Sequence, residues 1–323
     1  GDESLTGRPM GRIITPLTLM GAAIESDCDG TPPLQLSGGL ELHAIDYDLP
    51  IASAQVKSAI LLAGLYAEGR TSVTEPAVTR DHTERMLASM GAELSVQGGT
   101  VSIAGGQTLR GCAVEVPGDL SSATFIILAT LLSQDADILI KNVGINPTRT
   151  GVIDILKGMG ANLALENRRS LGQEPVADLR VRASQLQGGP VDPALVSLAI
   201  DEFPALFVAA AAAKGKTRFS GLEELRVKES DRISAMADGL RRLGIEVEET
   251  PDGAVVYGGR FTGGEVESYH DHRVAMSLAI AGTIADGEVL VRGVDNVDTS
   301  FPGFKDLMTS LGAHIVVADG AVQ

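Results

Sequence analysis

A helix-terminating glycine recurs along this chain at intervals of domain size. It follows Met or Leu and precedes Ala or Ile at Gly21, Gly91, Gly160, Gly244 and Gly312, with spacings of 70, 69, 84 and 68 residues. A glycine in this place ends a helix because it adopts the left-handed backbone conformation without a steric penalty. A period near 70 residues is too long for a solenoid repeat, so each period holds a small folding unit of several elements.

Each period has the same order of elements. An Ala- and Leu-rich helix comes first, followed by a β-branched strand such as 71–74. A second helix then ends at the glycine, and two alternating strands follow it, the second of them at 100–104 in one copy. The Ala-rich helices are expected at residues 54–67, 122–132, 205–213 and 274–285. The pattern predicts an α/β fold whose unit is β-α-β-α-β-β or a circular permutation of it.

The dipeptide Pro117-Gly118 interrupts this pattern between the last strand of one unit and the first helix of the next. We therefore expect a first domain over residues 1–117, which holds the end of one unit and one full unit. A second domain of three β-α-β-α-β-β units is expected over residues 118–323. The first copy begins with only a loop and its second helix, so we expect the natural protein to extend further toward the N-terminus.

The charge balance narrows the range of partners. Lys and Arg number 26 against 42 Asp and Glu, the net charge is −16, and aromatic residues make up 3%. A nucleic-acid partner is not expected, because such binders need a basic surface and aromatic stacking platforms. The longest apolar runs are about half of the ~20 residues needed to cross a bilayer. No signal peptide is visible either, so we expect no membrane partner and a cytoplasmic location.

The cysteines and histidines give little sign of special chemistry. Cys28 and Cys112 are too few for a disulfide framework and are expected to be buried thiols. His270 and His272 form a His-x-His pair, but no third His or Cys ligand accompanies them. No metal site is therefore expected.

Unusual polar residues collect at the starts of the repeated helices. Cations stand there at Arg8, Arg80, Lys228, Arg232 and Arg273. They oppose the helix dipole, which favours acidic residues at a helix N-terminus. An anionic ligand would compensate, because cations and free N–H groups at converging helix starts form an anion site. The sequence therefore indicates a ligand that carries phosphate or carboxylate groups.

Simpler interpretations remain open for individual residues. Ser53, Ser121 and Asp201 are residue types typical of helix N-caps. Glu229 and Arg232 have the spacing of an ordinary i, i+3 surface salt bridge. The unusual polar residues recur at one end of each unit. This recurrence favours a ligand site, because charges that contact only solvent would be distributed independently of the repeat.

Several motifs in the right order resemble the 5-enolpyruvylshikimate-3-phosphate synthase family, from Gly1 nearly to the C-terminus. They are Arg8-Pro9-Met10, Ser53-Ala54-Gln55-x-Lys57, Arg80-x-His82-x-Glu84, Asn146-x-Thr148-Arg149, Asp201-Glu202-Phe203-Pro204, Lys228-Glu229-Ser230-Asp231-Arg232 and His270-Asp271-His272-Arg273. The Ser-Ala-Gln-x-Lys, Arg-x-His-x-Glu and Asn-x-Thr-Arg versions resemble the bacterial class II subgroup, which is often tolerant of glyphosate. The family's N-terminal Lys-Ser…Arg segment and its Asn-Ala-Gly-Thr loop are absent from this sequence.

The resemblance implies a fold and a reaction. The fold would be inside-out: barrel-like α/β domains of repeated β-α-β-α-β-β units, with parallel helices inside, sheets outside and an active-site cleft between the domains. The reaction would transfer enolpyruvate from phosphoenolpyruvate to the 5-hydroxyl of shikimate 3-phosphate, in the shikimate pathway of aromatic amino-acid biosynthesis. The implied partners are these small anionic substrates, with no metal and no organic cofactor. We expect a monomer at full length, or a chain that a separate N-terminal segment complements.

The resemblance also implies roles for single residues. Asp201 would take the proton of the 5-hydroxyl, and Glu229 would deliver a proton to C3 of phosphoenolpyruvate. Shikimate 3-phosphate would be bound by Ser53, Ala54, Gln55, Arg80, Asp201 and Lys228. Phosphoenolpyruvate would be bound by Arg8, Gln55, Arg232 and Arg273.

Other functions stay open at this point. UDP-N-acetylglucosamine enolpyruvyl transferase shares the fold but usually depends on a loop cysteine, and neither Cys28 nor Cys112 lies at a repeat helix start. RNA 3′-phosphate cyclase shares related units but requires a nucleotide-binding histidine and a more basic surface. From a different class, the chain could be a non-catalytic fragment that only binds phosphorylated metabolites or a complementing chain.

Overall fold

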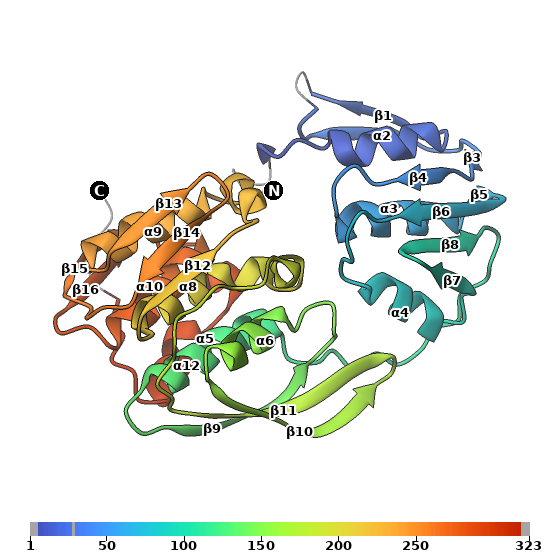
Figure 1. The fold of residues 1–323 in the computed structure, drawn as a ribbon. Coiled ribbons are helices and arrows are strands. Elements are labelled where there is room, and N and C mark those ends of the chain that lie inside the picture. The colour runs from blue at the N-terminus through green and yellow to red at the C-terminus, as the bar shows by residue number, and fades with distance from the viewer. Residues whose placement is uncertain (1–5, 28–29, 318–323) are drawn as a thin grey trace. The chain divides into compact units, whose positions relative to one another are not determined.

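The computed structural model describes residues 6–27 and 30–317. The chain divides into two compact units (Figure 1), one of residues 1–116 with 170–174 and one of residues 117–169 with 175–323. Each unit has its own hydrophobic core. The division falls between Val116 and Pro117. The short segment Ser170–Glu174 contains the end of one strand and the start of the next, and it belongs to the first unit although the rest of both strands belongs to the second.

The first unit contains one full β-α-β-α-β-β run. Its elements are β4 (Asp46–Asp48), α3 (Ala54–Gly64), β6 (Arg70–Thr74), α4 (His82–Ser89), β7 (Leu94–Gln97) and β8 (Thr100–Ala104). They are preceded by α2 (Gly11–Leu19), the antiparallel pair β1 (Ala23–Ser26) and β2 (Leu34–Ser37), and β3 (Leu42–His43), which pairs in parallel with β5 (Ala67–Glu68). The main sheet has the order β4-β6-β8-β7, and α3 packs against β6 and β8, burying Ile60 and Leu61.

The second unit repeats the α-β-α-β-β order twice and then begins a third copy. The first copy is α5 (Leu120–Leu132), β9 (Asp137–Gly144), α6 (Gly151–Gly158), β10 (Asn162–Leu171) and β11 (Glu174–Arg182). The second is α8 (Phe203–Ala212), β12 (Lys216–Phe219), α9 (Arg232–Arg242), β13 (Val247–Thr250) and β14 (Gly253–Tyr257), with α7 (Val196–Ala199) ahead of it. The third is β15 (Gly264–Glu267), α10 (His272–Gly282), β16 (Val289–Arg292), α11 (Val297–Ser300) and α12 (Phe304–Ser310).

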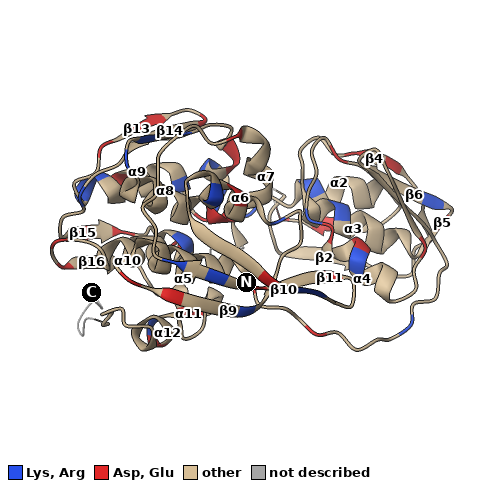
Figure 2. Cartoon of the chain, turned by 60° about the horizontal axis from the view of Figure 1, so that its bottom comes forward, with Lys and Arg blue, Asp and Glu red and all other residues tan. Residues whose placement is uncertain are grey.

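The helices of the second unit lie inside and its sheets outside. In Figure 1, α5, α8 and α10 run beside one another, and all three contact each other. Each of these helices also packs against a strand: α5 against β9, α8 against β14 and α10 against β16. Neither α5 nor α8 contains Lys, Arg, Asp or Glu (Figure 2), as expected for helices surrounded by protein. The inside-out α/β architecture expected from the sequence is confirmed.

The five repeat glycines end their helices in one common way. Gly21, Gly91, Gly160, Gly244 and Gly312 have φ between 84° and 99°. In each case the N–H of the next residue donates to the carbonyl oxygen five residues earlier at 2.9–3.0 Å. This is the Schellman motif, which satisfies carbonyl groups that the helix end leaves without partners. The repeat signal read from the sequence is therefore a local backbone cap used five times.

The structure corrects several local expectations. Helix α3 ends at Gly64 instead of residue 67, because Ala67 and Glu68 pair with β3. The strand expected before α5 is reduced to a parallel bridge at Gly118, and the one before α8 to bridges at Gln187 and Pro190. Cys112 is exposed, not buried, because it lies in an exposed connecting segment between β8 and α5. Cys28 lies outside the described residues.

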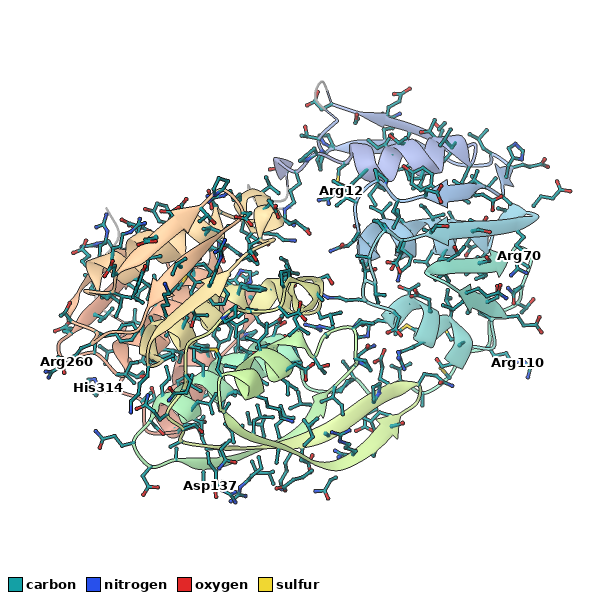
Figure 3. The ribbon with its side chains drawn as sticks, in the orientation of Figure 1. Arg12, Arg70, Arg110, Asp137, Arg260 and His314 are labelled. Atoms are coloured by element: carbon teal, nitrogen blue, oxygen red, sulfur yellow. The ribbon has the colours of Figure 1, made fainter. Side chains whose placement is uncertain are left out.

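Charged side chains on the outer sheets and on the segments that connect the elements pair with one another. Asp137 contacts Arg180 and Arg182, and Arg260 contacts Asp286. Figure 3 shows Asp137 and Arg260 extending away from the ribbon, and the Arg260 side chain is 84% exposed. Exposed pairs of this kind contribute little to stability, because solvent screens their attraction. Among the described residues, no helix combines the length and the apolar character needed to span a bilayer.

Candidate active site

The starts of α8, α9 and α10 meet around one buried arginine. Arg232, the first residue of α9, exposes 1% of its side chain. Its Nη2 lies 2.6 Å from Glu229 Oε2, and its Nε lies 2.8 Å from Asp271 Oδ2. Its Nη1 lies 3.6 Å from Asp201 Oδ1. Burial acts to lower the pKa of Arg232, but Asp271 and Glu229 outweigh it and raise the pKa, so the guanidinium stays charged.

Asp271 is both the N-cap of α10 and the counter-ion of Arg232. Its Oδ1 accepts hydrogen bonds from the backbone N–H of Arg273 at 2.9 Å and of Val274 at 3.4 Å. Its Oδ2 accepts from Arg232, and its side chain is fully buried. The start of α10 and the side chain of Arg232 are therefore fixed by the same carboxylate.

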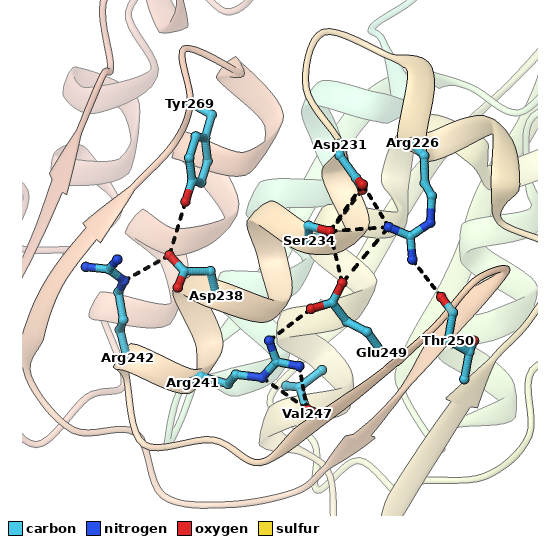
Figure 4. Close-up of polar contacts among 10 residues, drawn as sticks. All are labelled: Arg226, Asp231, Ser234, Asp238, Arg241, Arg242, Val247, Glu249, Thr250 and Tyr269. Atoms are coloured by element: carbon cyan, nitrogen blue, oxygen red, sulfur yellow. Dashed lines mark hydrogen bonds and ion pairs between the residues drawn. The ribbon is translucent and has the colours of Figure 1, made fainter.

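The segment ahead of α9 is held at both ends. Asp231 caps α9 by accepting from the backbone N–H of Ser234 at 3.0 Å. Arg226 donates to Asp231 at 2.7 Å and to the Thr250 carbonyl at 2.6 Å, as Figure 4 shows. Between them, Lys228 donates to Glu224 at 2.7 Å. The cations of this segment thus project from a loop with a fixed backbone.

Glu202 is a second buried charge at the same helix starts. Its side-chain Oε1 accepts a short hydrogen bond from the Ser121 hydroxyl. Arg149 donates to that hydroxyl at 2.6 Å and contacts Asp119 at 3.1 Å. Burial raises the pKa of Glu202, and the nearby Arg273 and the Ser121 bond only partly oppose it. The Asn-x-Thr-Arg and Asp-Glu-Phe-Pro motifs are therefore joined through Ser121.

A small pocket lies between the starts of α3 and α4 in the first unit. It has a volume of 230 Å³ and is lined by Ala54, Gln55, Ser58, Arg80, His82 and Thr83. Ser53 caps α3 by accepting from the backbone N–H of Val56 at 3.4 Å. Free N–H groups at two helix starts, together with an arginine, form an anion-binding arrangement.

The tip of the β10–β11 hairpin contacts one wall of this pocket. His82 Nδ1 lies 2.8 Å from Glu174 Oε1, and Arg85 donates to the Gln173 carbonyl at 2.9 Å. Gln173 lies in the turn between β10 and β11 and Glu174 is the first residue of β11, and both belong to the first unit. Asp81 accepts from Arg85 at 2.8 Å, so the first turn of α4 has contacts on two sides.

Comparison with known proteins identifies the family. A family model described as EPSP synthase (3-phosphoshikimate 1-carboxyvinyltransferase) matches residues 1–308. The chain belongs to the EPSP synthase family. It is 55% identical to the 3-phosphoshikimate 1-carboxyvinyltransferase of Nitrosococcus oceani over 315 residues, which is 98% of this chain and 71% of the relative. The corresponding protein of Xanthomonas euvesicatoria is also 55% identical, over 98% of this chain and 72% of the relative.

Solved structures agree with this family membership. The EPSP synthase of Acinetobacter baumannii matches with a TM-score of 0.90 and 52% identity, covering 98% of this chain and 74% of that chain. The enolpyruvyl transferase NikO of Streptomyces tendae, at 19% identity, has a TM-score of 0.78 and shares the fold. The inside-out helices described above are thus the fold of the EPSP synthases.

The residues that the sequence singled out fall into two groups in this EPSP synthase family member. Arg80, Gln55 and the cap residue Ser53 lie at the pocket of the first unit or directly beside it, together with Ala54. Asp201, Lys228, Glu229, Arg232 and Arg273 lie at the helix starts of the second unit. Arg8 lies half-buried ahead of α2 in the first unit.

The simpler interpretations hold for some residues only. Ser53 is an N-cap, as expected, but Asp119 caps α5 in place of Ser121, and Asp201 lies one residue before the cap position of α8. Glu229 and Arg232 do pair, yet Arg232 is buried, so the pair is not an ordinary surface salt bridge. Within the described parts of the chain, no group of three His, Cys, Asp or Glu side chains could hold a metal ion.

Sequence reasoning assigned no role to Glu202 or Asp271, and only that of a helix N-cap to Ser121. All three stand at starts of the repeated helices, which is the signal that had already singled out the cations. Their importance depends on partners 39 to 81 residues away in the chain, and spacing along the sequence does not reveal such partners.

Glu202→Gln is expected to be more resistant to unfolding than the wild type near pH 8, with the gap closing toward about pH 4. The pKa of Glu202 is raised in the folded state, chiefly by burial. The stability it contributes is therefore present at low pH and is lost as pH rises through the folded-state pKa, whereas glutamine stays neutral. Denaturant midpoints of both proteins across this pH range check the trend.

Asp119→Asn is the control, because its stability relative to the wild type should change with pH in the opposite direction. Burial acts to raise the pKa of Asp119, but Arg149 and the N–H of Ser122 outweigh it and lower the pKa. This variant should be less stable than the wild type near pH 8, and its deficit should shrink as pH falls through that lowered pKa. The same pH trend in both variants would contradict the assignment for Glu202.

Proposed function

We propose that this EPSP synthase family member transfers the enolpyruvyl group of phosphoenolpyruvate to the 5-hydroxyl of shikimate 3-phosphate. The products are 5-enolpyruvylshikimate 3-phosphate and inorganic phosphate. The observation that carries the proposal is the Arg232 cluster, in which the carboxylates of Asp201 and Glu229 both contact one buried guanidinium. An addition to an enol carbon followed by elimination needs an acid, a base and a fixed positive charge.

Two proton transfers are proposed for the two carboxylates. Asp201 takes the proton of the 5-hydroxyl while the oxygen of that hydroxyl bonds to C2 of phosphoenolpyruvate, and Glu229 delivers a proton to C3. The adduct then returns a proton from C3 to Glu229, the bond from C2 to the phosphate oxygen breaks, and the double bond re-forms. The proton held by Asp201 passes to the leaving phosphate, so both carboxyl groups return to their starting states. The two side chains lie on different segments around Arg232, which supports separate roles for them.

Arginines are proposed to bind phosphoenolpyruvate. Arg232 Nη1 is buried, and in the described part of the chain it has no hydrogen-bond partner, since Asp201 is 3.6 Å away. A buried guanidinium nitrogen without a partner is costly, and a phosphate or carboxylate oxygen would satisfy it. Arg273 donates to the Asp201 carbonyl at 3.3 Å and so lies beside the proposed base. Arg8 and Gln55 complete the set that the family resemblance implies.

The pocket of the first unit is proposed to bind shikimate 3-phosphate through Ser53, Ala54, Gln55 and Arg80. Its 230 Å³ suits a small anionic group, being below the roughly 300 Å³ at which drug-sized sites begin. Asp201 and Lys228 are the further proposed contacts with this substrate. We also propose a cytoplasmic location, in line with the role of the relatives in biosynthesis, and a monomer at full length or a chain that a separate N-terminal segment complements.

Calorimetry and phosphate release test the proposal. Shikimate 3-phosphate should release heat on binding, phosphoenolpyruvate should then bind to that complex, and the mixture should release phosphate. Shikimate itself, which lacks the phosphate, should bind at least about tenfold more weakly because the charge-assisted hydrogen bonds are lost. A folded sample that gives no heat with either substrate would refute the proposal. Binding without phosphate release would favour the binding-only alternative.

A further inference from the structure

A buried lysine lies between α3 and α4 with two carboxylates around it. The Lys57 side chain is 1% exposed, and its Nζ lies 2.9 Å from Glu75 Oε2 and 2.7 Å from Glu84 Oε1. The side chains of Glu75 and Glu84 are 7% and 9% exposed. Lysine and glutamate are almost never fully buried unless they are paired. None of these three residues has a part in the chemistry proposed above, although Lys57 and Glu84 end two of the sequence motifs.

The triad of Lys57, Glu75 and Glu84 joins the segments that carry the pocket residues of the first unit. Lys57 lies one turn after Ser53 in α3, and its backbone N–H donates to the Ser53 carbonyl at 3.1 Å. Glu75 directly follows β6 and accepts a short hydrogen bond from Thr79, the residue before Arg80. Glu84 lies in the first turn of α4. A single ammonium group therefore links the start of α3, the loop that bears Arg80 and the start of α4.

A neighbouring contact links the same two helices. The hydroxyls of Ser58 and Thr83 are 2.7 Å apart, and both residues line the pocket. Each follows or precedes a triad residue directly in the chain: Ser58 follows Lys57, and Thr83 precedes Glu84. The wall of the pocket and the triad are thus adjacent along both helices.

We propose that Lys57, Glu75 and Glu84 are positioning residues that set the spacing between the starts of α3 and α4, and so shape the pocket for the phosphate of shikimate 3-phosphate. The proposal rests on the proposed function of that pocket. Apolar side chains of similar volume would hold two helices at least as stably, because burying charges costs free energy. A three-membered ion cluster adds fixed directions and distances, which an anion site with several donors requires.

The charges of the triad predict different losses of substrate binding for different substitutions. One cation and two carboxylates leave an excess of negative charge beside a site for a phosphate. Lys57→Met would leave two carboxylates without their cation, whereas Glu84→Gln would leave one cation with one carboxylate. Loss of Lys57 should therefore weaken substrate binding more than loss of the Glu84 charge, because it disturbs the geometry and also repels the anion.

The test measures Kd for shikimate 3-phosphate by calorimetry, and KM for both substrates and kcat by phosphate release. Glu84→Gln should raise Kd and KM for shikimate 3-phosphate at least about fivefold, and Lys57→Met at least about 20-fold. The KM for phosphoenolpyruvate and kcat at saturation should change less than about twofold. Arg70→Met is the matched control, since Arg70 is an exposed cation of the same unit that extends outward from β6 (Figure 3), and it should change none of these constants.

Several results would overturn the proposal. The positioning role fails if folded Glu84→Gln and Lys57→Met bind shikimate 3-phosphate with the wild-type Kd. It also fails if apparent kcat falls in proportion to a lost folded fraction while both KM values stay at those of the wild type, since that is a purely structural effect. Should Lys57→Met not fold, Glu84→Gln and Glu75→Gln decide the matter. A wild-type protein that does not bind shikimate 3-phosphate refutes the proposed function itself, whereas wild-type binding that the variants retain refutes only the positioning role.

Discussion

Glu229→Gln is expected to lower kcat at least about 100-fold while leaving the Kd values of both substrates within about threefold. The amide has the shape of the carboxylate, and its oxygen can still accept from Arg232 Nη2, which lies 2.6 Å from Glu229 in the wild type. An amide cannot deliver a proton to C3, so the addition step loses its acid. Single-turnover phosphate release at saturating substrates measures the chemical step, and calorimetry measures binding.

A neighbouring glutamate provides the control for this variant. Glu224 pairs with Lys228 at 2.7 Å, as Glu229 pairs with Arg232, and its side chain is 44% exposed. Glu224→Gln should leave kcat within about twofold, because an exposed pair contributes little. Wild-type turnover in Glu229→Gln would remove that residue from the role of acid. Equal losses in both variants would indicate instead that the loop before α9 had been disturbed.

The repeat was predictable from the sequence because its signal is local. A Schellman cap needs one glycine and a few flanking residues, and all five glycines formed it. The first strands of two units were less predictable. They are reduced to bridges at Gly118, Gln187 and Pro190, where Gly and Pro weaken strand formation and the pairing depends on a neighbour that the sequence does not show.

The cations of the candidate site were predictable because their placement conflicts with the helix dipole. Their partners were not. Asp271 reaches Arg232 across 39 residues, and Lys57 reaches Glu84 across 27, so both pairs form only once helices have packed. The prediction for Cys112 was wrong for a different reason. Cysteine is usually buried, but Cys112 lies in an exposed connecting segment.

Asp271→Asn is expected to lower the free energy of unfolding of the second unit by about 3–5 kcal/mol. Asp271 is fully buried and accepts from the Arg232 side chain, from the Ser230 hydroxyl at 3.2 Å and from two backbone N–H groups. Asparagine has one acceptor oxygen, so its NH₂ group must face either the guanidinium or the helix start, and both are donors. Arg232 would lose its fully buried counter-ion, and denaturant unfolding measures the cost.

Asp231→Asn separates capping from charge pairing. Asp231 caps α9 as Asp271 caps α10, but its side chain is 37% exposed and its ion pair with Arg226 is partly solvated. Asparagine is as good an N-cap as aspartate, so this variant should lose at most about 1 kcal/mol. Similar losses in both variants would mean that Asp271 acts only as a cap. A much larger loss in Asp271→Asn, together with weaker phosphoenolpyruvate binding, is the result expected if a buried carboxylate is needed to hold Arg232 toward its ligand.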